Sequence, residues 1–90
     1  MRQKKGFVLR DVCGKDVVVA EGLGAIDLGK LVTMNKTAAW IWKKAEELGE
    51  FNADQMADAL CEHYDVKKDK ATKDVNALFE YWLQIGIIEA

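Results

Sequence analysis

Side chains able to do acid–base or nucleophilic chemistry are few in this chain and widely spaced. His63 is the one histidine, and it falls on the apolar face of a predicted helix, where we expect a structural residue rather than a general base. The chain has no serine, and neither cysteine has a base at the spacing of a known nucleophile motif. No glycine-rich loop precedes a Lys-Ser/Thr pair, as a phosphate-binding loop requires. We therefore expect a domain that is not an enzyme and needs no cofactor.

The two cysteines, Cys13 and Cys61, are also far apart, with no C-x-x-C pair and no clustered histidines. They do not form a zinc pattern, and we interpret both as free thiols of a reducing compartment, with a disulfide as the alternative. In "CEHYD", residues 61–65, only Cys61 and Asp65 have four-residue spacing, so we expect no metal site. No segment has the apolar run of a signal peptide or a membrane span. We expect a cytoplasmic protein with no membrane partner.

Composition favours one small domain. Of the 90 residues, 50% are hydrophobic and 31% are charged, which is typical of a globular domain. We expect a single domain over residues 1–90, with residues 1–5 as a flexible tail. The net charge is −2 and is uneven, since residues 31–90 hold seven lysines and eleven acidic residues.

The first third of the chain favours β-structure. Residues 6–12 and 16–22 are short β-rich runs, and the Cys-Gly-Lys between them is a hairpin signal with Gly14 placed for the turn. Residues 23–30 contain glycines and are predicted to form a bent connection. Residues 31–34 then form a third strand, which gives a three-stranded antiparallel meander.

The rest of the chain favours helices. Asn35 is the predicted N-cap of a first helix that ends at Gly49. Asn52 and Gln55 form the capping signal of a second helix, whose buried face is predicted to be Met56, Ala59, Leu60, His63 and Tyr64. A third helix runs from about residue 68 to 85, and residues 87–89 return as a short extended tail. The sequence therefore predicts an α+β fold, a winged helix-turn-helix-like arrangement of a three-stranded antiparallel sheet followed by three helices.

Two features of the sequence provide more apolar surface than a single core needs. Trp40 lies on a face with lysines, and either covers a sheet edge or contacts a partner. In the third helix the apolar arc covers roughly 200°, about twice the usual stripe. Either the small domain wraps this helix as core, or one flank stays open as a groove. An edge strand has unpaired backbone groups, so an edge beside such a groove could bind an extended apolar peptide.

DNA binding is the first alternative for a winged helix. Residues 65–74 interleave lysines with aspartates, and the helical part is net negative without arginine. Phosphate attraction needs surplus positive charge, and base reading favours arginine. We interpret this segment as a solvated face and expect no nucleic-acid partner. A general protein–protein interaction module is the second alternative, and an exposed edge could also self-associate into a homo-oligomer.

The junction "VTMNKTAAWIW", residues 32–42, resembles that of PqqD-like proteins, in which an apolar strand ends in Leu-Asn-x-Thr-Ala before an Ile/Leu-Trp pair. Further matches are "FNADQMADAL" (51–60), "HYDV" (63–66) and "KDVNALFEYWLQIGII" (73–88). The resemblance covers roughly residues 6–89. Lys67 and Lys68 depart from it, because the family's third helix commonly has an acidic start, and Trp40 is bulkier than the usual residue.

The resemblance implies a precursor-peptide recognition element. Such domains bind the leader of a ribosomally made precursor peptide and present it to a modifying enzyme, often a radical SAM protein; in PqqD itself the product is pyrroloquinoline quinone (PQQ). The leader peptide bound by members of this family joins the sheet beside the third strand and lies against the third helix. The peptide-binding residues implied for this chain are Leu31, Val32, Thr33, Met34, Val75, Leu78, Phe79 and Trp82.

Overall fold

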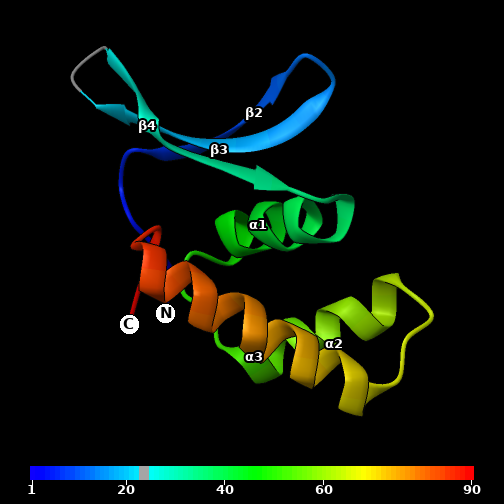
Figure 1. Ribbon diagram of the computed structural model, residues 1–90. Helices are drawn as coiled ribbons and strands as arrows, with labels where there is room; N and C mark the ends of the chain where they lie inside the picture. Colours follow the sequence, from blue (N-terminus) through cyan, green and yellow to red (C-terminus); the bar gives the residue numbers. More distant parts are fainter. Residues whose placement is uncertain (23–24) are drawn as a thin grey trace.

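A computed structural model describes residues 1–22 and 25–90 of the chain (Figure 1). The elements are β1 (Arg2–Gln3), β2 (Phe7–Val12), β3 (Lys15–Gly22), β4 (Ala25–Met34), α1 (Lys36–Leu48), α2 (Ala53–His63), α3 (Lys68–Ile85) and β5 (Ile88–Glu89). Within the described residues, an antiparallel sheet in the order β2-β3-β4 precedes three helices. The predicted α+β architecture is confirmed.

The β2–β3 hairpin closes where the sequence predicted it. Cys13 and Gly14 both have positive φ, at 54° and 80°, the pair of left-handed conformations that two-residue hairpin turns favour. The Gly14 N–H also donates to the Asp11 side chain at 3.0 Å. The turn therefore sets the β2–β3 register, in which Val12 lies opposite Lys15.

The third strand is longer than predicted. Residues 25–30, expected as part of a bent connection, belong to β4, and they pair with the far end of β3 through Ala20↔Asp27 and Gly22↔Ala25. A register shift between Val18 and Ala20 divides the pairing into two parts, as a β-bulge does. Glycine weakens a strand but does not prevent it when a long partner strand pairs its backbone. Residues 23–24 lie outside the described residues.

The segment expected as a flexible tail is part of the packed fold. Arg2 and Gln3 pair with Glu89 and Ile88 in an antiparallel β1–β5 ribbon, which brings the two ends of the chain together (Figure 1). The Gln3 side chain also donates to the Trp42 carbonyl at 2.9 Å. These contacts join distant parts of the sequence, so no local pattern indicated them.

The helices begin and end close to their predicted residues. The Asn35 side chain accepts from the Ala38 N–H at 2.8 Å, and Asn52 accepts from the Gln55 N–H at 2.7 Å. At the other end of the chain, Gly86 has a φ of 82° and ends α3 in the left-handed conformation. Each cap satisfies backbone groups that a helix end leaves unpaired.

The core joins the sheet to all three helices. In Figure 1, α1 lies between the sheet and the α2–α3 pair. Trp42 of α1 meets Trp82 of α3 edge to face, with ring centroids 5.3 Å apart, and Phe51 and Phe79 pack at 5.2 Å. Aromatic pairs of this geometry stabilise a core beyond the area they bury. Among the described residues, none of the helices is both long and apolar enough to cross a membrane.

The end of α2 is exposed, although the sequence predicted a buried face there. His63 and Tyr64 are exposed, whereas the sequence placed them with the buried residues of that helix. Trp40 stacks on the His63 ring at 4.5 Å and meets the Tyr64 ring edge-on at 5.9 Å. α2 ends at His63, so its last turn passes beyond the core residue Leu60. Trp40 therefore covers the end of α2 and not a sheet edge.

Candidate functional site

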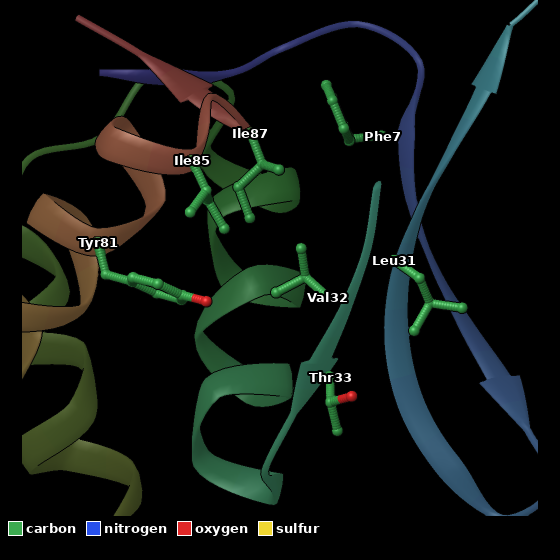
Figure 2. Close-up of a pocket in the computed structure, with 7 residues that line it drawn as sticks. All are labelled: Phe7, Leu31, Val32, Thr33, Tyr81, Ile85 and Ile87. Atoms are coloured by element: carbon green, nitrogen blue, oxygen red, sulfur yellow. The ribbon is translucent and has the colours of Figure 1, made fainter. Parts of the chain in front are cut away.

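An open groove of about 500 Å³ lies between β4 and the C-terminal half of α3 (Figure 2). Its lining residues are Phe7, Leu31, Val32, Thr33, Tyr81, Ile85 and Ile87. Figure 2 shows Val32 of β4 pointing toward Tyr81 and Ile87 on the opposite wall. The groove therefore has one wall of strand and one wall of helix, and its side chains are mostly apolar.

α3 supplies the helical wall because its apolar residues form two stripes. The first stripe is buried and consists of Ala71, Val75, Phe79 and Trp82. The second stripe, roughly 90° away on the helix surface, faces the clefts beside α3 and consists of Leu78, Tyr81 and Ile85, with Asp74 at its polar end. Tyr81 is 51% exposed and Ile85 38% exposed, so the wide apolar arc is divided between core and groove.

β4 supplies the other wall and a free sheet edge. Within the described chain, β4 has a strand neighbour on one side only, namely β3. The outer edge of such a strand presents backbone N–H and C=O groups at alternate residues. Leu31 and Thr33 are exposed along this edge, while Met34 is buried where the strand enters α1. An extended chain could pair with β4 and place side chains in the groove.

A second cleft, of about 280 Å³, continues beyond the end of β4, between α1 and α3. Ile41 and Leu60 form an apolar floor, and Thr37 and Asp74 stand at its polar rim. Leu78 of α3 lines this cleft, three residues before Tyr81 of the groove. The groove and the cleft thus follow one face of α3.

Comparison with known families shows which family this chain belongs to. The PqqD family, described as coenzyme PQQ synthesis protein D, matches residues 11–88. The chain belongs to the PqqD family. The resemblance stated from the strand-to-helix junction is confirmed.

One solved structure supports the same fold. TbiB1, determined in complex with the TbiA(beta) leader peptide, matches this PqqD-family chain with a TM-score of 0.76 at 17% sequence identity. The match covers 100% of this chain and 96% of TbiB1. A search of curated proteins finds no match.

The structure separates the residues that the resemblance implied for this PqqD-family site. Three of them line the groove, namely Leu31, Val32 and Thr33. Leu78 lines the second cleft. The other four are buried in the core and support the walls from behind: Met34, Val75, Phe79 and Trp82. These four side chains are at most 5% exposed, so they have almost no surface that a peptide could contact directly.

Four groove residues were missing from the sequence-based site: Phe7, Tyr81, Ile85 and Ile87. Tyr81 and Ile85 belonged to the wide apolar arc of α3, so the signal for them was present. Phe7 and Ile87 come from opposite ends of the chain, and only the tertiary fold brings them to one end of the groove.

Two of the lysines near the start of α3 are paired with aspartates, which argues against a phosphate-binding surface there. Lys68 is bound by Asp54 and Asp58 of α2, and Lys70 lies 3.3 Å from Asp74. The hydrogen bond to Asp58, with the nearby Asp54 charge, raises the pKa of the Lys68 ammonium. Nucleic-acid binding needs uncompensated positive charge, and these pairs leave α3 little of it. The comparisons likewise give no support to the DNA-binding alternative.

Proposed function

We propose that this protein is a non-catalytic peptide-binding domain that recognises the leader of a ribosomally made precursor peptide. The observation that carries the proposal is the juxtaposition of the free β4 edge with the open apolar groove. Neither feature alone would select a ligand. Together they can bind the backbone of an extended peptide and the side chains on one of its faces.

The leader adds to the sheet as a fourth strand beside β4. Backbone hydrogen bonds to residues 31–34 supply affinity that does not depend on sequence. Because side chains alternate along a strand, every second leader residue faces the groove and contacts Val32, Tyr81 and Ile85. Burying one aliphatic side chain there contributes roughly 1.5–3 kcal/mol, so apolar residues at alternate positions define the preferred leader.

Relatives support this assignment. TbiB1 binds a leader peptide and shares the fold of this chain, and the family description names coenzyme PQQ synthesis. We infer that the bound leader is presented to a peptide-modifying enzyme of the radical SAM type, in the cytoplasm, where precursor peptides are made. The precursor of PQQ is the first ligand to examine.

The test compares two residues of α3 that are equally exposed. Ile85 is 38% exposed and lines the groove, whereas Leu83 is 40% exposed and lies on the opposite flank of the buried stripe. We expect Ile85→Lys to weaken binding of the cognate leader at least tenfold, because an ammonium replaces an apolar contact that the leader would bury. Leu83→Lys introduces the same charge and should change the affinity less than about twofold.

Calorimetric titration of a synthetic leader into the wild type and both variants measures these affinities. The leader of the PQQ precursor is the first one to titrate. Amide shifts recorded during the titration should concentrate in residues 31–34 and 78–87. Equal weakening by both variants, or shifts centred elsewhere, would contradict binding in the groove.

A further inference from the structure

The segment that leads to the Phe7 and Ile87 end of the groove contains two lysines, which line a neighbouring hollow with Arg2, Gln3 and Glu89. The segment of residues 4–6 crosses this end on its way to β2 (Figure 2), and the Lys4 N–H donates to the Ile87 carbonyl at 3.1 Å. Both Lys4 and Lys5 are exposed there.

Among the side chains that the structure describes, these two lysines have no partner of opposite charge. Glu89, the acidic residue beside them, is already paired with Arg2 at 2.8 Å. Neither Lys4 nor Lys5 forms an ion pair with a side chain of residues 1–21 or 31–90. The Lys4 Nζ lies beside Gly86, 3.6 Å from where a Cβ on that glycine would stand. Since cations are stabilised at a helix C-terminus, the end of α3 holds this ammonium next to the groove.

The far end, beyond Met34, has the opposite sign. Asp74 lines the second cleft, and Asp65 lines the cleft that adjoins it. Lys70 is the one cation lining these two clefts in the described residues, and it is paired with Asp74. The groove and clefts therefore run from a basic end to a weakly acidic end.

The sheet register gives this polarity a direction along a bound peptide. Phe7 lies opposite Ala20, which lies opposite Asp27, so the first half of β4 lies toward the basic end. Antiparallel pairing is the more stable arrangement per residue. A strand added antiparallel to β4 therefore begins beside Met34 and ends toward Lys4 and Lys5.

We propose that the ligand is a peptide with acidic residues on the C-terminal side of the apolar segment that pairs with β4, and that Lys4 and Lys5 recognise this acidic flank. The inference rests on the proposed function and specifies its ligand. Charges at the rim of an interface act mainly on orientation and association rate, and the acidic far end repels a peptide placed in the reverse direction. Two exposed charge pairs change an equilibrium constant by roughly three- to tenfold.

A random dodecapeptide display library, selected against the wild-type protein at low salt, tests the inference. Selected peptides are synthesised and their affinities measured for four proteins: the wild type, Lys4→Glu/Lys5→Glu, Lys43→Glu/Lys73→Glu and Ile85→Lys. The second double variant changes the net charge equally at exposed lysines away from the groove. Thermal melts confirm that each variant is folded.

We expect groove-binding peptides, defined by weakened binding to the Ile85→Lys variant, to be enriched in Asp and Glu after their apolar segment. The Lys4→Glu/Lys5→Glu variant should weaken them roughly three- to tenfold more than the control double variant does. Three results would overturn this inference but leave the proposed function intact. The groove-binding peptides could lack acidic enrichment, or carry their acidic residues before the apolar segment. Both double variants could also weaken these peptides equally. If no selected peptide depends on Ile85, the proposed function fails, and this inference fails with it.

Discussion

Tyr81 and Trp82 are neighbours on α3 whose replacement should have opposite consequences. Trp82 has no exposed surface and packs against Trp42 and Phe79. Removing its indole with Trp82→Ala should cost about 3–5 kcal/mol of unfolding free energy, because the core collapses only partly around such a cavity. A domain of this size has only about 5–13 kcal/mol to lose, so this variant should be close to unfolding.

Tyr81→Ala should instead affect binding. Its side chain is 51% exposed and lines the groove, so truncation should lower the unfolding free energy by less than about 1 kcal/mol. An aromatic residue buries some 150–250 Å² in total, and a bound leader would cover up to the exposed half. At about 25 cal/mol per Å² this gives up to roughly 2–3 kcal/mol, and we expect leader affinity to fall about tenfold or more.

Urea unfolding followed by circular dichroism measures the stabilities, and calorimetry measures leader affinity for the folded variants. Because Trp82→Ala should be close to unfolding, Trp82→Phe provides a milder core change with an expected cost of roughly 1–2 kcal/mol. The division of α3 into a core stripe and a groove stripe is refuted if Tyr81→Ala destabilises as much as Trp82→Phe. It is also refuted if Trp82→Phe keeps wild-type stability but loses the leader.

Three further predictions concern stability. Cys13→Asn should raise it by about 0.5–1 kcal/mol, seen as a higher urea midpoint, because Cys13 has a φ of 54° and Asn tolerates that region better. Asn35→Ala should lower it by about 1 kcal/mol in the same assay, through loss of the helix cap. Lys68→Met should lower the thermal midpoint near pH 8, because the hydrogen bond to Asp58 raises the pKa of Lys68 above its ordinary 10.5. The raised pKa of Lys68 stabilises the fold at pH values below 10.5. This contribution is lost as the pH rises through the folded-state pKa. The thermal midpoints of the wild type and Lys68→Met should therefore converge at high pH.

Features encoded by neighbouring residues could be predicted from the sequence. Asn35, Asn52 and Gly86 mark helix ends because each satisfies or redirects the backbone within one turn. The β2–β3 turn is likewise local, since Gly14 accommodates the conformation that the hairpin needs. The order of strands and helices follows from these boundaries, which is why the fold class was correct.

Features that depend on distant partners could not be predicted. Residues 25–30 extend β4 because the far end of β3 pairs with them, although their own glycine and polar residues favour a connection. Residues 1–3 are ordered by β5 and Phe51, which lie far along the chain. His63 has suitable spacing for burial, but it is the last residue of α2 and lies beyond the core residue Leu60, so it stays exposed although Trp40 stacks on its ring.

The candidate site combines both kinds of information. A helical wheel gives the width of the apolar arc on α3, and a width beyond one core stripe indicates a second contact. It does not say which flank is free, because both Leu83 and Tyr81 extend the arc. The tertiary fold decides this, since β4, Phe7 and Ile87 line the groove together with Tyr81 and not with Leu83. The Lys4 N–H bonds to the Ile87 carbonyl, so the packing that forms the groove also brings a lysine to its end.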